Sequence, residues 1–229
     1  MTTASPALRN TRKEILGLSI PLFASAGFDR VSMRDIAAAV GVTPAALYHH
    51  FSDKEQLCLE VVGHAFTEKV GPLKSLLIGA GAPWSQLDTF VIQFTRMLAR
   101  EKDFRRLMQW VLLDSDEPRL QSLVDCVFRD LFDALHALAR ELAPGGDAHL
   151  LAISIIGLVN YPFETRSVRR FLPGYQPRHE DPEFIARHVI DLLRNGLDTS
   201  HEEKSEQCPT QGKRAEQTSL LHDCKEKKR

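Results

Sequence analysis

Apolar residues recur along most of this chain at the three- and four-residue spacing of an α-helix, and no segment keeps the alternating pattern of a β-strand. Clusters of glycine and proline interrupt the pattern and predict loops or helix breaks. The chain is therefore expected to be all-α, with its helices packed as a bundle. The expected helices cover residues 8–27, 33–40, 44–50, 53–79, 84–101, 103–114, 117–142, 148–166 and 181–197. The Gly71-Pro72 pair is expected to bend or break the fourth of them.

Residues 32–50 predict two short helices joined by a tight turn. Ser32 has the side chain of an N-cap, and Asp35 stands where a capping box needs its carboxylate. Gly41 can adopt a positive φ and end the first helix, after which Thr43 caps the second helix and Pro44 takes its first position. This arrangement is typical of a helix-turn-helix, whose second helix fits the major groove of DNA.

A third cap is expected at Ser52-Asp53-Lys54-Glu55, where a long helix begins. The second short helix would bury Leu47 and leave most of its other side chains free. A capped helix pair also occurs as a generic helical hairpin, so the pair alone does not establish DNA binding.

A longer string of residues narrows the interpretation. The segments LFASAGF (22–28), SMRDIA (32–37), GVT (41–43), LYHHF (47–51) and KEQL (54–57) follow one another in an order and spacing that resemble the DNA-binding domain of the TetR family of transcriptional regulators. The resemblance covers about residues 10–60. It implies a cytoplasmic homodimer that binds a palindromic operator, usually as a repressor, and is released by a small molecule bound in the C-terminal helices.

The resemblance also implies which residues face DNA. They are Ser32, Arg34, Thr43, Pro44, Ala45, Ala46, Tyr48, His49 and Lys54. Thr43, Tyr48 and Lys54 would bind backbone phosphates, and Arg34 would reach a base or a phosphate. Ala45 and Ala46 leave few hydrogen-bonding side chains on the second helix, so indirect readout of DNA shape is expected to contribute strongly.

The chain divides into three expected parts. Residues 1–52 form the helix-turn-helix domain, residues 53–197 form a helical domain for ligand binding and dimerisation, and residues 198–229 form a charged tail expected to be disordered. Net charge is −1 for the whole chain, but the first 51 residues carry five basic and three acidic side chains. This mildly basic balance permits nucleic-acid binding without establishing it.

Aromatic and methionine side chains of the C-terminal part fall on helical stripes, where they are expected to build the bundle core. Since ligand cavities often lie between bundle helices, some of them are also candidates to line a pocket for a mostly apolar effector. The candidates are Phe94, Met97, Met108, Trp110, Phe128 and Phe163.

The helix expected at 148–166 is apolar on all sides, which is more than one buried face requires. A two-fold interface with a second copy of the chain would cover its outer side. The residues expected there are Ile153, Ser154, Ile156, Gly157, Ile185, Val189 and Leu192.

Other chemistry finds little support in the sequence. His49 and His50 are adjacent and diverge on a helix, and the cysteines at 58, 126, 208 and 224 have no metal-ligand spacing, so no metal or cofactor is expected. No common catalytic motif, signal peptide or bilayer-length apolar segment is evident, which argues against an enzyme and for a cytoplasmic protein. The alternative function is a ligand-sensing or protein-interaction module without specific DNA binding.

Overall fold

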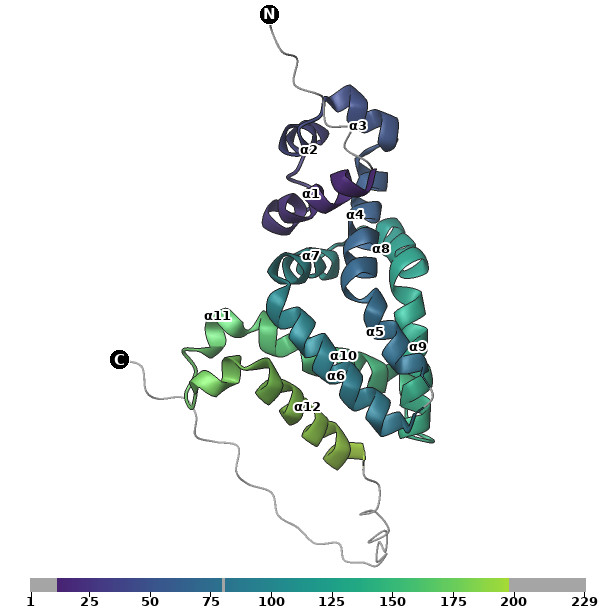
Figure 1. Cartoon of the computed structure of the whole chain (residues 1–229), viewed down its shortest axis with the longest axis vertical. Helices are drawn as coiled ribbons and strands as arrows, with labels where there is room; N and C mark the ends of the chain where they lie inside the picture. The colour runs from purple at the N-terminus through teal and green to yellow at the C-terminus, as the bar shows by residue number, and fades with distance from the viewer. Residues whose placement is uncertain (1–11, 80, 198–229) are drawn as a thin grey trace, which may run out of the picture. The chain divides into compact units, whose positions relative to one another are not determined.

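The computed structural model describes residues 12–79 and 81–197 (Figure 1). The expected tail at 198–229, with Cys208 and Cys224, lies outside the described residues. The α-helices are α1 (Arg12–Ala26), α2 (Met33–Val40), α3 (Pro44–His50), α4 (Lys54–Lys69), α5 (Gly71–Ile78), α6 (Pro83–Arg100), α7 (Lys102–Leu112), α8 (Glu117–Leu123), α9 (Arg129–Leu142), α10 (Ala148–Glu164), α11 (Arg166–Arg169) and α12 (Pro182–Leu197). A π-helix, η1 (Val124–Phe128), joins α8 to α9, and a 3-10 turn, η2 (Pro177–Glu180), precedes α12. The described residues contain no strand, and the predicted all-α fold is confirmed.

The helix break predicted from glycine and proline lies close to its expected position. The helix predicted over 53–79 is divided after Lys69, and α5 begins at Gly71 with Pro72 in its first turn. The helix predicted over 117–142 is divided into α8, η1 and α9, which follow one another without a loop, and the middle segment has π-helical hydrogen bonding. No residue in that stretch signals the change, and the short helices α11 and η2 also went unpredicted.

The core runs through both the N-terminal helices and the C-terminal bundle. In the first four helices, the largest fully buried side chains include Phe23, Ile36, Leu47, Phe51 and Leu57. In the bundle, α6 packs against α12, α10 packs against α9, and α5 packs against both α6 and α9. Burying this apolar area is the main term that stabilises the fold.

The N-terminal helices join the bundle where α1 packs against α7. Gly27, which follows α1, has a φ of +80°, and a Cβ built on it would lie 2.9 Å from the indole ring of Trp110. The Trp110 Nε1–H donates to the carbonyl of Ala24 at 3.3 Å. Only glycine therefore satisfies both the backbone conformation and the close approach of the ring.

Gly27→Ala is expected to lower the free energy of unfolding by about 2–4 kcal/mol, because it adds a clash with Trp110 to the strain of a left-handed residue. Gly41→Ala is the matched control: Gly41 has a φ of +74° but no neighbouring atom within 4 Å of the added Cβ. Gly41→Ala should lower the free energy of unfolding by about 1–2 kcal/mol, because it introduces backbone strain but no clash. Urea unfolding of both variants measures the difference, and equal losses would contradict the role assigned to Trp110.

Candidate nucleic-acid interface

The first helix of the predicted pair is held by the expected caps. The Ser32 hydroxyl accepts from the backbone N–H of Asp35 at 3.2 Å, and the Asp35 carboxylate accepts from the backbone N–H of Ser32 at 2.8 Å. Hydrogen bonds from the hydroxyl and backbone of Ser32 lower the pKa of Asp35. Gly41 ends the helix in the left-handed conformation, which turns the chain into α3.

The second helix presents a nearly uncharged face to solvent. The Thr43 hydroxyl accepts from the N–H of Ala46 at 3.1 Å, and Pro44 occupies the first turn. Leu47 is fully buried, and the Tyr48 side chain on the next position is 53% exposed. Four other residues predicted to face DNA are exposed: Thr43, Pro44, Ala45 and His49. Ala46 is half-buried.

The cap of the next helix differs from the prediction by one residue. Asp53, not Ser52, is the N-cap of α4, because its carboxylate accepts from the N–H of Gln56 at 2.8 Å. The backbone N–H of Ser52 donates instead to the side-chain oxygen of Gln56 at 2.7 Å. Both residues suit a cap chemically, so the sequence did not distinguish the two registers.

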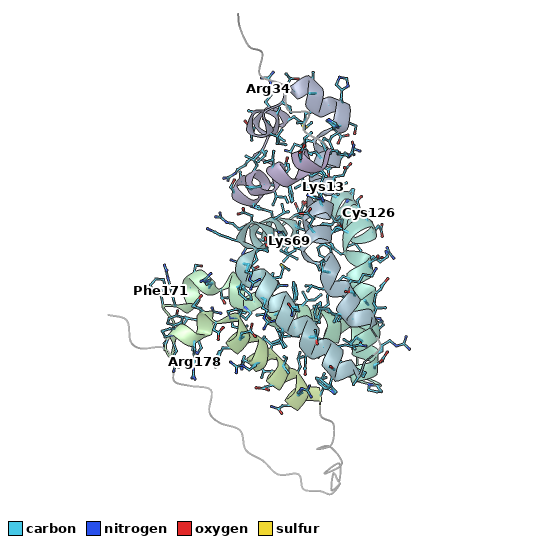
Figure 2. All side chains as sticks on the ribbon, viewed as in Figure 1. Lys13, Arg34, Lys69, Cys126, Phe171 and Arg178 are labelled. Atoms are coloured by element: carbon cyan, nitrogen blue, oxygen red, sulfur yellow. The ribbon has the colours of Figure 1, made fainter. Side chains whose placement is uncertain are left out.

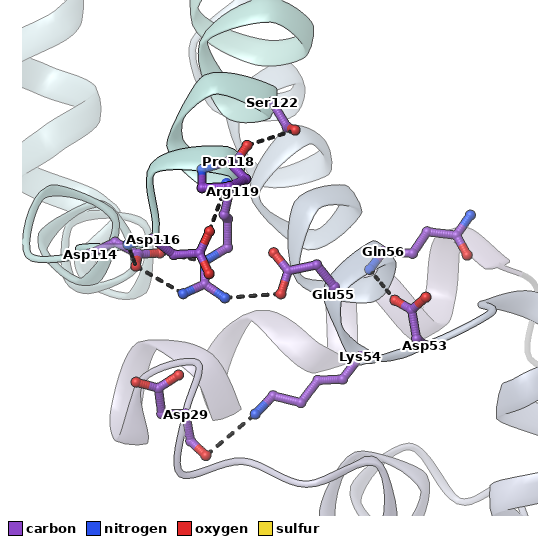
Figure 3. Close-up of polar contacts among 10 residues, drawn as sticks. All are labelled: Asp29, Asp53, Lys54, Glu55, Gln56, Asp114, Asp116, Pro118, Arg119 and Ser122. Atoms are coloured by element: carbon purple, nitrogen blue, oxygen red, sulfur yellow. Dashed lines mark hydrogen bonds and ion pairs between the residues drawn. The ribbon is translucent and has the colours of Figure 1, made fainter.

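Two basic side chains from neighbouring elements border α3. Arg34 is exposed on α2 (Figure 2). Lys54 is half-buried at the start of α4, and its ammonium donates to the carbonyl of Asp29 at 3.3 Å (Figure 3). Because an ammonium has three N–H donors, Lys54 can hold the loop before α2 and still donate to a phosphate.

Arg12 was missed by the sequence reasoning and holds α3 in place. Its guanidinium donates to the carbonyl of His50, at the end of α3, and pairs with the carboxylate of Glu60 on α4. It also lies over the ring of Phe51, 4.6 Å from the centroid. One basic residue thus joins α1, α3 and α4, although a lone arginine near the start of a helix carries no sequence signal for such a role.

Arg119 connects α8 to the N-terminal helices (Figure 3). Its Nη2 donates to Asp114 at 2.8 Å and its Nη1 donates to Glu55 on α4 at 2.9 Å. The guanidinium also lies 5.9 Å from the ring centroid of Phe28, in the segment between α1 and α2. Arg119 therefore adds a polar contact beside the Gly27–Trp110 contact.

The structure distributes the predicted pocket residues over different parts of the bundle. Phe94 and Phe163 are buried in the core, and Met97, Met108 and Phe128 are half-buried against it. Trp110 lies against Gly27, as described above. Three of the six line separate hollows: Trp110 lines one beside Gly27, Phe163 lines a second and Phe128 lines a third.

The predicted interface residues fall into two groups. Ile185 and Val189 are buried within the chain's own core, so they are not available to a partner. Ile156 is half-buried, and the other predicted residues are exposed: Ile153, Ser154, Gly157 and Leu192. The helix α10 carries a buried apolar stripe and, on another side, an exposed one made by Leu150, Ile153, Gly157 and Tyr161. Leu150 and Tyr161 were not predicted.

Three further observations bear on chemistry. Residues 12–79 and 81–197 contain no group of three or more His, Cys, Asp or Glu side chains placed to hold a metal. Cys58 is buried, and burial raises the pKa of its thiol to about 12. No helix within these ranges is long and apolar enough to cross a membrane.

Several known proteins are similar to this chain in sequence or in fold. Residues 15–61 match the model of the family described as bacterial regulatory proteins, tetR family. The HTH-type transcriptional repressor KstR2 of Mycolicibacterium smegmatis is 32% identical over 177 residues, which are 63% of this chain and 84% of that protein. The nucleoid occlusion factor SlmA of Escherichia coli K12 is 27% identical over 142 residues, 62% of this chain and 72% of that protein. The transcriptional regulator FadR of Bacillus subtilis, solved in complex with stearoyl-CoA, has a similar fold with a TM-score of 0.66 and 17% identity, covering 80% of this chain and 97% of that one.

Arg119→Met is expected to lower the free energy of unfolding by about 2 kcal/mol near neutral pH, since it removes the charged partner of the Asp114 carboxylate, which is 7% exposed and keeps a hydrogen bond from the backbone N–H of Asp116. Hydrogen bonding by Arg119 lowers the pKa of Asp114 in the folded state. This contribution is therefore present above the ordinary aspartate pKa of about 3.9 and is lost as the pH falls through the folded-state pKa. The difference in the free energy of unfolding between wild type and Arg119→Met should therefore become smaller at acidic pH.

Arg129→Met provides the control for that experiment. Arg129 forms an exposed i,i+4 pair with Asp125 on the surface of the bundle, and its removal should cost at most about 0.5 kcal/mol. Denaturant unfolding between pH 3 and 7 compares the two variants. A similar loss of unfolding free energy in both variants would show that the Arg119–Asp114 ion pair contributes no more than an exposed surface pair.

Proposed function

Since the chain belongs to the TetR family of transcriptional regulators, we propose that it represses transcription in the cytoplasm by binding a palindromic operator as a homodimer and leaves the operator when a small-molecule effector binds. Members of this family are DNA-binding regulators and not enzymes. The observation that carries the proposal is the exposed face of α3 within a fully capped helix-turn-helix.

The contacts proposed with DNA follow from the chemistry of that face. Tyr48 and Thr43 offer hydroxyl donors to phosphates, and Lys54 offers an ammonium at the edge of the same surface. Ala45 lets the helix backbone approach the bases closely, and its methyl can touch a thymine methyl. Arg34 is the side chain proposed to reach a base or a phosphate from α2. With so few base-reading groups on α3, deformability of the operator supplies much of the specificity.

A dimer is proposed because the exposed apolar stripe of α10 needs a cover. The side chains of Leu150, Ile153 and Tyr161 are between 49% and 68% exposed in the single chain. Gly157 on the same stripe has no atom near a built Cβ, which leaves space for a helix of the partner. Leu192 of α12, 47% exposed, extends the surface. A two-fold interface through these helices would place two α3 helices for successive major grooves, about 34 Å apart.

Release is proposed to act through α4, which begins beside α3 and packs against α5, α7 and α8 in the bundle. An effector that binds more tightly when α4 is tilted would favour a dimer whose recognition helices no longer fit the operator spacing. FadR of Bacillus subtilis, which shares the fold, is in complex with stearoyl-CoA, and this supports a small-molecule effector with a large apolar part for this chain. We propose that the apolar part of the effector contacts the half-buried side chains of Met97 and Met108.

Tyr48→Ala and Lys54→Ala are expected to weaken operator binding several-fold, by similar amounts for different sequences, because both residues are proposed to contact phosphate. The plot of log affinity against log salt should lose about one unit of slope for Lys54→Ala. Lys74→Ala, which removes a lysine paired with Asp130 in the bundle, is the control and should leave the affinity unchanged. Thermal unfolding checks that the loss of the Lys54–Asp29 contact leaves the domain folded.

The same titrations separate the two candidate functions. Wild-type binding that depends steeply on salt but not on the palindrome would reflect only general electrostatics, and would favour the ligand-sensing or protein-interaction module. An unchanged salt slope for Lys54→Ala would remove this residue from the phosphate contacts.

Ile153→Arg is expected to convert the dimer into folded monomers, because the side chain is 49% exposed in the single chain and the arginine disturbs only the proposed interface. Ile156→Arg is a less direct test, since that side chain is half-buried against the chain's own core. Leu112→Arg, at a position 80% exposed on α7, is the control and should remain dimeric. Analytical ultracentrifugation measures the mass, and a soluble, unchanged dimer for Ile153→Arg would exclude this surface as the interface.

A further inference from the structure

A hollow rich in basic side chains lies between α7, the end of α10, α11 and the segment that leads into η2. Its volume is about 690 Å³, within the range of small-molecule sites. We call it the basic hollow, after the residues Lys102, Arg105, Arg106, Arg166 and Arg170 that line it. None of these residues belongs to α2, α3 or the exposed stripe of α10, so neither the proposed DNA contact nor the proposed dimer accounts for them.

The positive charge of the basic hollow is only partly compensated. It contains two carboxylates, of which Glu180 accepts from Arg166 at 2.5 Å and from Arg169 at 3.1 Å. The other, Glu164, accepts a hydrogen bond from the Gln109 amide. Among the described residues, Lys102, Arg106 and Arg170 form no ion pair with a carboxylate.

Arg105 is the most enclosed of the five. Its guanidinium donates to the carbonyl of Leu98 and lies 5.6 Å from the ring centroid of Phe163, which is buried at the base of the hollow. Burial, followed by the positive charge of Arg166, lowers the pKa of Arg105, and the negative charge of Glu164 offsets part of this effect. A half-buried cation beside a second cation is unfavourable, and an anion bound between them would offset that cost.

The groups present select a class of ligand. Guanidinium groups bind the oxygens of phosphates and carboxylates in paired hydrogen bonds, and several converging cations favour a multiply charged anion over a single carboxylate. We propose that the basic hollow binds the phosphate groups of a phosphorylated small molecule, and that this molecule is the effector. The second part of this inference rests on the proposed function, whereas the binding site does not.

The location of the basic hollow suits an effector. Lys102, Arg105 and Arg106 lie on α7, and the same helix carries Trp110, whose ring rests on Gly27 at the end of α1. Arg106 and Trp110 are four residues apart, which is about one helical turn. A phosphate that draws α7 toward α11 would therefore act directly on the contact between the bundle and the N-terminal helices.

Isothermal titration of the full-length protein tests the site, with inorganic pyrophosphate, ADP and adenosine as titrants at constant ionic strength. Pyrophosphate and ADP are expected to bind, and adenosine is not, because it lacks the charged groups. The double variant Lys102→Gln/Arg106→Gln removes two exposed, unpaired cations and should weaken ADP binding at least tenfold. The control Arg140→Gln/Arg187→Gln removes the same charge from exposed positions on α9 and α12 and should change it less than twofold.

Three outcomes would overturn the site: no phosphate titrant binds at millimolar concentration, adenosine binds as tightly as ADP, or both double variants lose affinity equally. Weaker operator binding by the Lys102/Arg106 variant without any titrant would show that the hollow contacts DNA instead. The effector role is tested separately, by adding stearoyl-CoA, the compound bound to FadR, which carries both phosphate groups and a large apolar part, to the protein–operator complex. Binding to the hollow with no release of operator overturns that role alone, and a wild-type protein that binds ADP but no operator overturns the proposed function alone.

Discussion

The contact between the Trp110 ring and the backbone of Gly27 is the constraint on which the arrangement of this chain depends. It joins α7 of the bundle to the end of α1, and the indole N–H donates to Ala24 in the same place. A residue with a side chain at position 27 would meet the ring and would also be strained by the positive φ. Because the ring lies against the backbone with no side chain between them, α1 and α7 are held at a fixed separation at this point.

Polar contacts reinforce this junction from a second direction. Arg119 joins Asp114 and Glu55 and lies over Phe28, so α8, α4 and the segment after α1 share one guanidinium. Arg12 has the same role within the N-terminal helices, where it joins α1 to α3 and α4. Because a planar guanidinium offers five donors in fixed directions, one arginine can position three elements at once.

The helix α7 combines two proposed roles along its length. Its first turns face the basic hollow, and its last turn forms the junction with α1. The helix α10 likewise has a core-facing stripe and an exposed one, which is why it is apolar all round without being buried all round. In both helices, side chains that serve different proposed surfaces are only a few residues apart in sequence.

Local chemistry made much of the molecule predictable. Ser32, Asp35, Gly41, Thr43 and Pro44 determine helix starts and stops through contacts within a few residues, so the sequence alone determined the helix-turn-helix and its exposed face. The break after Lys69 followed in the same way from glycine and proline. At the start of α4, where Ser52 and Asp53 can both cap, local chemistry was ambiguous and the geometry selected Asp53.

Contacts between distant residues were decided only by the tertiary structure. Periodicity marks an apolar side chain as buried but does not say against what, so nothing in the sequence showed that Trp110 rests on Gly27, 83 residues earlier in the numbering. Ile185 and Val189 were assigned to an interface for the same reason and lie in the chain's own core. The roles of Arg12 and Arg119, and the gathering of basic side chains from α7 and α11, depend on how helices cross in space. No spacing along the chain encodes such crossings, because a helix fixes only the direction of its own side chains and not its neighbours.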